Sequence, residues 1–250
     1  MEPKAVSRVE GSALRRALAS LRSRGYYRAL SRLHAELRPR TYLEIGVRKG
    51  DSLALAGGAK VCVGVDPQPI LTRPAASNCR IFEETSDDFF GGHDLREIMG
   101  GRDLDLAFID GMHLFEFVLR DLANVERCAS PGTLAVLHDC LPVDAVSATR
   151  DRTTSLWTGD VWKCVFALRK HRPALTLTVI DVGPSGLLMV EGLDPADTTL
   201  SERADEIVGE FGPLPFEYFV RNRDVVDGLA GSVDDVVARV LEARGSRTRE

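Results

Sequence analysis

Two acid–histidine pairs follow consecutive apolar segments of this chain. Asp110 ends the segment LDLAFID and His113 follows three positions later, while His138 and Asp139 end the segment GTLAVLHD. Neighbouring strands lie about 4.8 Å apart, and doubly wound sheets bind ligands beyond the carboxyl ends of their strands. We therefore expect Asp110 and Asp139 to converge on one site, with His138 beside them. Two carboxylates repel unless a cation or a proton lies between them, which predicts an oxygen-liganded divalent cation such as Mg²⁺.

Each of these residues also has a purely structural interpretation. An acid at the end of a parallel strand often caps the next helix, which alone would explain Asp110. His113 can be a first-turn helix residue without a task. His138 can be a core histidine, or a ligand of a metal softer than magnesium. Their arrival together at one end of one sheet favours a functional site.

Residues 41–66 have the pattern of an adenosine-binding unit. TYLEIGV and VCVGVD indicate two buried strands, DSLALAGG a short helix, and Gly46 and Gly50 bracket the turn between them. Asp66 ends the second strand, 20 residues after Gly46, which is about the distance at which an acid meets ribose hydroxyls in such units.

The turn favours S-adenosylmethionine over a dinucleotide. Arg48 stands where the G-x-G-x-x-G pattern needs its second glycine, and a charged side chain there obstructs the close approach of a pyrophosphate. S-adenosylmethionine has no phosphate. Its carboxylate suits a helix N-terminus, and its cationic end can face Glu44. The alternative is a Rossmann-like turn without a ligand.

Strands and helices alternate from residue 41 onward, which predicts an α/β fold. The expected strands are 41–47, 61–66, 80–84, 104–110, 133–138, 175–182 and 186–191, and the expected helices are 51–57, 94–99, 114–128 and 160–171. Continuous apolar strands indicate a doubly wound, Rossmann-like, mostly parallel sheet of seven strands with both faces covered. A short GPSG turn joins the last two strands as a hairpin, so we expect one antiparallel strand.

The two ends of the chain read as helical additions to this core. We expect residues 1–40 to form a helical lid or packing segment with an Arg-rich first helix, 41–193 the cofactor-binding core, and 194–250 a helical extension broken at PLPF. Packing over the sheet or against a partner in a homodimer is the simpler account of the first segment. As a lid, it would place Tyr26 and Tyr27 against the acceptor.

Composition excludes several classes of protein. The net charge of −5 gives no general attraction to nucleic acid. No apolar run approaches the roughly 20 residues that span a bilayer, and MEPKAVSRVEGS lacks the apolar core of a secretory signal. The five cysteines are scattered and free of C-x-x-C spacing, which predicts a reducing, cytoplasmic location without disulfides or a thiolate zinc site.

Several segments resemble those of one enzyme family. YLEIGVRKGDS, VGVD, ETSDDFF, FIDGMHLFEFVLRDL and GTLAVLHDC are similar, in this order, to the motifs of class I S-adenosylmethionine-dependent methyltransferases. Over about residues 40–192 the chain resembles the bacterial metal-dependent sugar O-methyltransferases, such as those that act on macrolide sugars, and more distantly the catechol-type enzymes. The resemblance implies methyl transfer to a hydroxyl of a saccharide or glycosylated metabolite; a methylmannose polysaccharide is one such acceptor.

The resemblance implies a role for each matching position. Contacts to S-adenosylmethionine would come from Glu44, Gly46, Gly50 and Ser52 at the methionine part, Asp66 at the ribose, and Ser86 and Asp87 at the adenine. Metal ligands would be Asp110, His138 and Asp139, with Asp110 and His113 as the catalytic pair. There are two departures: position 138 is His where relatives usually have an acid, and position 113 is His where the catechol-type enzymes have Lys.

The implied mechanism is deprotonation of a hydroxyl followed by methyl transfer. The cation would stabilise the developing alkoxide, and His113, with an ordinary pKa of about 6.5, would accept the proton. Trp157 and Trp162 would contact the acceptor face, and Asp160 or Lys163 its hydroxyls. Alternatively, Asp160 caps the 160–171 helix and Trp162 packs in the core.

Other functions fit fewer of these residues. An NAD-dependent oxidoreductase is disfavoured by Arg48 and by the absence of a Tyr-x-x-x-Lys pair. A metal-independent small-molecule methyltransferase and an accessory protein that binds the cofactor without turnover stay open. A metal phosphohydrolase is disfavoured because its His–Asp pair would end a strand within a cofactor-binding sheet.

Overall fold

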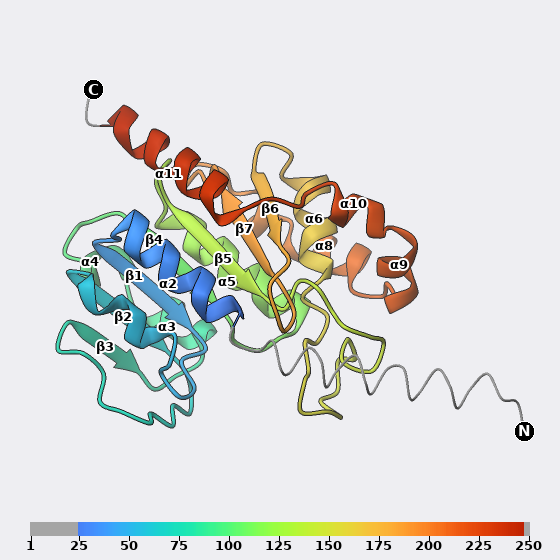
Figure 1. Cartoon of the computed structure of the whole chain (residues 1–250), viewed down its shortest axis with the longest axis horizontal. Coiled ribbons are helices and arrows are strands. Elements are labelled where there is room, and N and C mark those ends of the chain that lie inside the picture. Colours follow the sequence, from blue (N-terminus) through green and yellow to red (C-terminus); the bar gives the residue numbers. More distant parts are fainter. Residues whose placement is uncertain (1–24, 248–250) are drawn as a thin grey trace, which may run out of the picture.

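The computed structural model describes residues 25–247, and it has one seven-stranded sheet in the order β3-β2-β1-β4-β5-β7-β6 (Figure 1). The strands are β1 (Thr41–Ile45), β2 (Val61–Val65), β3 (Cys79–Phe82), β4 (Leu106–Ile109), β5 (Leu134–His138), β6 (Thr176–Ile180) and β7 (Leu187–Glu191). Strand β7 runs antiparallel to both β5 and β6, and the other neighbouring pairs are parallel. The predicted Rossmann-like sheet with one reversed strand is confirmed.

Helices cover both faces of the sheet because successive strand residues point to opposite faces. Helix α2 (Gly25–Leu37), the 3₁₀ helix η1 (Leu53–Gly58) and α11 (Val233–Arg247) pack on the face that carries Tyr42 and Phe108. Helices α3 (Ser86–Gly92), α4 (Leu95–Ile98), α5 (Phe115–Arg127) and α6 (Lys163–His171) pack on the face that carries Leu43 and Ile109. Figure 1 shows α2 and α11 in front of the strands and α5 and α6 behind them.

The C-terminal part adds short helices to the α5 face. They are α7 (Thr199–Glu202), α8 (Ala204–Phe211), α9 (Phe216–Arg221) and α10 (Arg223–Asp227), and the predicted break at PLPF falls between α8 and α9. Helix α3 was not predicted, since its seven residues SDDFFGG lack a helical period. The predicted first Arg-rich helix lies outside the described residues. Within residues 25–247, no helix is long and apolar enough to cross a membrane.

Parallel register brings the ends of β1, β4 and β5 to one line. Ile45 lies opposite Ile109, and Ile109 lies opposite Leu137. Gly46 follows β1, Asp110 follows β4, and His138 is the last residue of β5. These three residues therefore lie side by side. The direction of winding reverses between β1 and β4, and a doubly wound sheet opens its ligand crevice at that point.

Candidate active site

The turn after β1 lies directly against the end of β4. Gly46 has a φ of +92°, which favours glycine. A Cβ atom on Gly46 would lie 2.2 Å from the carbonyl oxygen of Asp110. This close approach of two backbones fixes the expected cofactor turn and the first acid of the site relative to one another.

Glu44 is hydrogen-bonded to the segment that follows this turn. It is fully buried; its Oε1 accepts a hydrogen bond from Ser52 Oγ at 2.7 Å, and its Oε2 accepts one from Tyr42 Oη at 2.6 Å. Burial raises the pKa of Glu44 to about 8, although the hydrogen bonds from Tyr42 and Ser52 oppose the shift. Glu44 therefore ties β1 to the start of η1 instead of presenting a charge to a ligand.

Asp66 lies at the carboxyl end of β2 with both oxygens oriented. Oδ2 accepts from the backbone N–H of Arg48 at 2.7 Å, and Oδ1 accepts from that of Gln68 at 2.8 Å. Each carboxylate oxygen keeps a further lone pair for a ligand. This is the arrangement expected of an acid that receives two vicinal hydroxyls.

Asp110, His113, His138 and Asp139 form a compact group, here called the acid–histidine cluster. Asp110 Oδ1 lies 2.9 Å from Nδ1 of His138 and 3.6 Å from Nε2 of His113, and Asp139 Oδ2 lies 2.5 Å from Nδ1 of His113. Asp139 also accepts a hydrogen bond from the Ser185 hydroxyl in the β6–β7 connection. The expected convergence of the two acids is present in the structure.

The cluster is strained and partly withdrawn from solvent. His113 and Asp139 have φ values of +53° and +64°, a region that non-glycine residues rarely adopt and that is often found at functional sites. Side-chain exposure falls from 23% for His113 and 19% for Asp110 to 4% for Asp139. The first two residues are thus the accessible members of the cluster.

Mutual pairing shifts the pKa values within the cluster. Burial alone would lower the pKa of His138, but the carboxylates of Asp139 and Asp110 outweigh it and raise the pKa to about 9. Burial also opposes protonation of His113, yet Asp139 and Asp110 raise its pKa. Burial would raise the pKa of Asp139, but His138 and His113 lower it to about 2. Asp139 and the two histidines thus shift one another's pKa values toward their charged forms.

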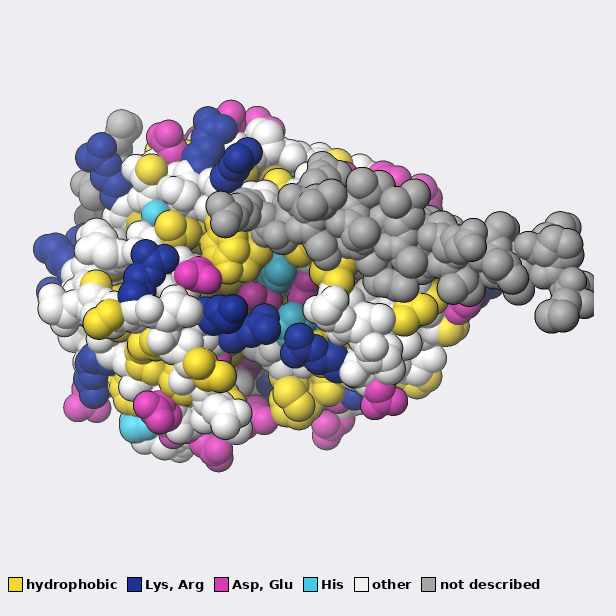
Figure 2. Space-filling view, turned by 60° about the horizontal axis from the view of Figure 1, so that its bottom comes forward, with side chains coloured by type: hydrophobic (Ala, Val, Ile, Leu, Met, Phe, Trp, Pro, Cys, Tyr) yellow, Lys and Arg dark blue, Asp and Glu magenta, His cyan; other side chains and the backbone are white. Residues whose placement is uncertain are grey.

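One cavity of about 800 Å³ joins the cofactor turn to this cluster. Figure 2 shows the hollow, with histidine and acidic side chains inside it and basic side chains at its edge. Predicted site residues that line it are Tyr26, Tyr27, Gly46, Asp66, Ser86, Asp87, Asp110, His113, His138, Asp139 and Trp157. Strand ends and loops far apart in the sequence therefore contribute to a single space.

Six predicted contact residues do not line this cavity. Glu44 and Ser52 hold the turn through the hydrogen bond described above, and Gly50 ends the turn with its N–H bonded to the carbonyl oxygen of Val47. The other three are Trp162, Asp160 and Lys163. Trp162 is 1% exposed in the core. Asp160 accepts from the backbone N–H of Phe115 and pairs with Lys163 at 2.8 Å. It therefore caps α5, 45 residues earlier in the chain, because the connection after β5 returns to that helix.

That connection, residues 139–162, has no helix or strand and carries cavity residues that the sequence did not reveal. They are Arg152, Ser155 and Leu156. Further lining residues that were not predicted as contacts are Arg48, Pro67, Gln68, Thr85, Met112, Phe117 and Pro184. Connections of this length usually have a function. The length of the connection and the presence of Trp157 in it were the sequence features that could have indicated a role at the cavity.

The base of this connection is closed by hydrogen bonds. The backbone N–H and the hydroxyl of Thr158 donate to the carbonyl oxygen of Ser147 at 2.9 and 3.0 Å, and both residues are buried. Residues between them, here called the 148–157 loop, thus have their ends held together as in an Ω-loop. Gly159 follows, and its Cα lies so close to His113 that a Cβ would overlap the carbonyl oxygen of that residue.

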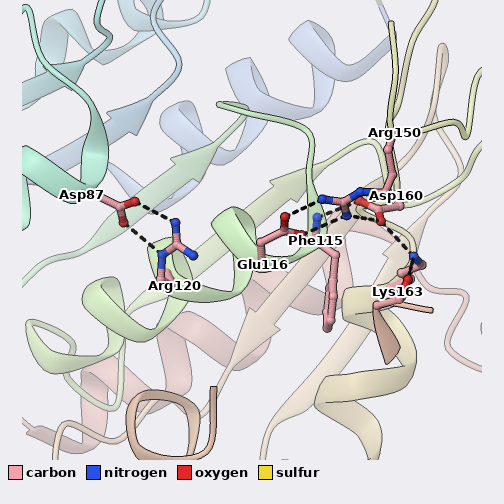
Figure 3. Close-up of polar contacts among 8 residues, drawn as sticks. Asp87, Phe115, Glu116, Arg120, Arg150, Asp160 and Lys163 are labelled. Atoms are coloured by element: carbon pink, nitrogen blue, oxygen red, sulfur yellow. Dashed lines mark hydrogen bonds and ion pairs between the residues drawn. The ribbon is translucent and has the colours of Figure 1, made fainter. Parts of the chain in front are cut away.

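Helix α5 is fastened to both sides of the cavity (Figure 3). On one side Arg120 binds Asp87 through two hydrogen bonds of 3.1 and 2.7 Å. On the other side Arg150 binds Glu116, and it reaches Asp160 at 2.8 Å. The first contact holds the wall beside Ser86, and the second holds the 148–157 loop.

Part of the cluster also fits a divalent cation. Asp110, His113 and Asp139 each offer one ligand atom, and these atoms lie within 4.8 Å of one another. Two carboxylates and one imidazole suit a divalent ion that keeps positions for water or another ligand. Compared with the predicted ligands, His113 takes the place of His138, whose Nδ1 faces Asp110 and whose ring lies 4.4 Å from that of Tyr26.

Comparison with known families agrees with this geometry. Residues 43–140 match a family model described as a methyltransferase domain. This part of the chain is therefore similar to a methyltransferase domain. The match begins in β1 and ends one residue after Asp139, so it contains both the turn and the cluster. A search among curated protein sequences finds no match to this chain.

Solved structures share the fold of this chain at low sequence identity. Cofactor-bound Rv0187 from MTB is 16% identical with a TM-score of 0.53, over 74% of this chain and 89% of that one. The O-methyltransferase TomG from Streptomyces achromogenes is 17% identical with a TM-score of 0.51, over 65% and 77%. The methyltransferase PaMTH1 from Podospora anserina is 11% identical with a TM-score of 0.50, over 78% and 97%. These likenesses show a Rossmann-like methyltransferase fold.

Proposed function

We propose that this protein is an S-adenosylmethionine-dependent O-methyltransferase that acts on a hydroxyl group of a small molecule. The observation that carries the proposal is the continuity of one cavity from Asp66 to the acid–histidine cluster. A methyl donor bound at Asp66 and a hydroxyl bound at the cluster would meet inside it. Such positioning contributes about 7–11 kcal/mol to catalysis when the reacting atoms are aligned.

The cofactor would lie along the ends of β1 and β2. Asp66 would accept hydrogen bonds from the ribose hydroxyls, while Ser86 and Phe117 would border the adenine on the α5 side. The turn at Gly46 would approach the methionine part. Support comes from the similar structures named above, since the TomG structure is a complex with S-adenosylmethionine and the PaMTH1 structure contains S-adenosylhomocysteine.

The acid–histidine cluster would take the hydroxyl proton. A divalent cation held by Asp110, His113 and Asp139 would supply positive charge that favours loss of this proton. The residues themselves orient the site: Asp139 contacts Nδ1 of His113, so the Nε2 side of that ring is left toward Asp110 and the cavity.

Metal-independent transfer is the second candidate, and the pairing within the cluster favours it. Each carboxylate already contacts an imidazole, so each acid has a partner within the cluster without a cation. In its neutral form His113, oriented by Asp139, would act as the general base, in the manner of other carboxylate–imidazole pairs.

The acceptor we propose is a saccharide or a glycosylated metabolite. Tyr26 and Tyr27 from α2 and Trp157 from the 148–157 loop line the cavity and provide aromatic contact surfaces beside the cluster. The division of the chain into segments 1–40, 41–193 and 194–250 stays a prediction, and so does the homodimer. We also propose a cytoplasmic location, because the sequence has scattered cysteines and none of the five forms a disulfide bond.

Cofactor binding tests the proposal most directly. Calorimetry should show that S-adenosylhomocysteine binds and that NADH does not; the reverse would make the protein an oxidoreductase. Asp66→Ala should weaken S-adenosylhomocysteine binding by tenfold or more, about the value of a charge-assisted hydrogen bond, without a change in melting temperature. Unchanged affinity would contradict the ribose assignment.

Chelation separates the two forms of the mechanism. If a cation assists, EDTA should abolish methyl transfer and added Mg²⁺ or Mn²⁺ should restore it. Asp110→Asn should then also weaken Mn²⁺ binding measured by electron paramagnetic resonance. Activity that is indifferent to EDTA would assign the protein to the metal-independent class, with His113 as the base.

A further inference from the structure

The wall opposite the cofactor turn combines an aromatic side chain with a free positive charge. Trp157 lies parallel to His113, with ring centroids 5.1 Å apart and planes inclined by 17°. Its Nε1 donates to the carbonyl oxygen of Thr149 at 2.6 Å, which fixes the indole. The guanidinium of Arg152 lies 5.9 Å from the Trp157 ring centroid and lines the same cavity.

The position of Arg152 is set by the loop that carries it. The 148–157 loop is closed at its base by Ser147 and Thr158, and Arg150 fastens it to Glu116 on α5 (Figure 3). Arg152 is two residues beyond that clamp. Because the loop is fastened on both sides of it, Arg152 is held near the cavity by the backbone that carries it.

The acids that line the cavity already have partners. Asp66 accepts from two backbone N–H groups, Asp87 binds Arg120, and Asp110 and Asp139 contact the two histidines. Within the described part of the chain, the guanidinium groups of Arg48 and Arg152 have no carboxylate partner. The chain has a net charge of −5, so free arginines at a cavity do not reflect a generally basic surface.

The two arginines come from different segments of the cavity lining, the turn after β1 and the 148–157 loop. The backbone of Arg48 binds Asp66, so its side chain starts from the cofactor side, where the carboxylate of the cofactor is the anion at hand. Arg152 starts from the side of Trp157 and His113, where the acceptor would lie. The proposed cofactor therefore accounts for Arg48 and leaves Arg152 unexplained.

We infer that the acceptor carries an anionic group, a carboxylate or a phosphate, which Arg152 binds beside the apolar surface of Trp157 and Leu156. This inference rests on the proposed function and narrows its substrate class. A guanidinium matches the planar geometry of carboxylate and phosphate oxygens. An anionic acceptor also complements the cationic sulfonium of the proposed donor.

Matched pairs of probes test the inference on the complex with S-adenosylhomocysteine. The pairs are glucose and glucuronate, mannose and mannose 6-phosphate, and catechol and 3,4-dihydroxybenzoate, with inorganic phosphate as the simplest anion. Binding is measured by calorimetry and ligand-observed NMR at constant ionic strength. In the wild-type protein at least one anionic probe should bind about tenfold or more tightly than its neutral partner.

Variants assign that preference to a residue. Arg152→Gln should bring the ratio of affinities close to one, and Arg152→Lys should keep part of it. Arg80→Gln is the matched control, since Arg80 is also exposed and also lies over an aromatic ring, that of Phe82 at 5.1 Å, but does not line this cavity. The control should retain the full preference.

Other outcomes overturn the inference. Equal binding of neutral and anionic probes, or failure of every anion including phosphate to bind, would show that the acceptor side has no anion site. A preference that is kept in Arg152→Gln but lost in Arg48→Gln would place the anion on the cofactor side. Binding of S-adenosylhomocysteine is measured first in the same titration, so its failure counts against the proposed function and not against this inference.

Discussion

The two sides of the cavity are built in different ways. The cofactor side consists of the turn after β1 and the acid after β2, where Gly46 and Asp66 stand directly at strand ends. The proposed acceptor side includes the 148–157 loop, which is held by its closed base and by contacts with α5 and His113. The first is positioned by the sheet, and the second by hydrogen bonds between segments distant in sequence. Substitutions on the two sides should therefore separate binding of the cofactor from use of the acceptor.

The largest effect is expected where the two sides touch. Gly46→Ala adds a Cβ atom that overlaps the carbonyl of Asp110 at a φ of +92°. The left-handed backbone costs about 1–2 kcal/mol, and displacement of neighbouring backbone costs about 1–3 kcal/mol more. Both S-adenosylhomocysteine binding and methyl transfer should be lost, with a lower melting temperature.

Gly57→Ala is the control for this change, because its Cβ would meet no atom within 4 Å. Calorimetry and thermal melts should leave the control close to wild type. A Gly46→Ala protein with normal cofactor affinity would show that the two sides are not joined at this contact.

The next effect concerns the buried acid beneath the cofactor turn. The pKa of Glu44 is raised to about 8 from an ordinary 4.5, so the folded protein retains a proton that the unfolded chain has lost. The resulting stability is fully present below pH 4.5 and is lost as the pH rises toward 8, at about 1.4 kcal/mol per unit. Glu44→Gln should remove this dependence between pH 5 and 8.

Urea unfolding at several pH values measures the difference. The exposed Glu36→Gln on α2 is the control and should keep the wild-type slope. An equal slope in Glu44→Gln and wild type would mean that Glu44 is ionised in the folded protein and faces a positive charge.

A smaller effect is expected from the clamp on the acceptor side. Arg150→Gln leaves the buried Asp160 with Lys163 and frees the 148–157 loop. We expect kcat/KM for the acceptor to fall about tenfold, because hydrogen bonds to charged groups contribute about 1.5–3 kcal/mol. The dissociation constant of S-adenosylhomocysteine should stay within twofold of wild type. A change in cofactor affinity without a change in kcat/KM would reverse the assignment of the two sides.

The smallest effect is expected from the clamp on the cofactor side. Arg120→Gln releases Asp87, but this ion pair is about 40% exposed at both partners, and exposed pairs contribute about 0.2–1 kcal/mol. The dissociation constant of S-adenosylhomocysteine should rise about two- to threefold, with kcat for the acceptor unchanged. Both ion pairs involve a residue of α5, so the two arginine variants test the two attachments of that helix separately.

The same comparison explains what the sequence could reveal. Apolar runs bounded by Gly46, Asp66, Asp110 and Asp139 predicted the strands, and parallel register then placed their ends together without further information. Glu44 was expected at the ligand, but side chains alternate along β1, and its neighbour Tyr42 shares its face and its hydrogen bond. The alternation of side chains along β1 was visible in the sequence. Which of its two faces Glu44 would share with a helix depended on how the helices pack on the sheet.

Residues of the long connection could not be placed in this way. Asp160 was expected to contact the acceptor or to cap the helix that follows it; instead it caps α5 through Phe115, a pairing across 45 residues that no local pattern specifies. Arg152 had no motif at all. Its position depends on the Ser147–Thr158 closure and on Arg150, which are properties of the folded chain.

The closed base of the 148–157 loop also has a practical consequence. Ser147 and Thr158 meet in the interior, and Gly159 meets the backbone of His113, so the ten residues of the loop lie between two fixed endpoints. If the proposed function holds, loops of other sequence grafted between these endpoints should change which molecules are methylated and leave binding of the methyl donor unchanged.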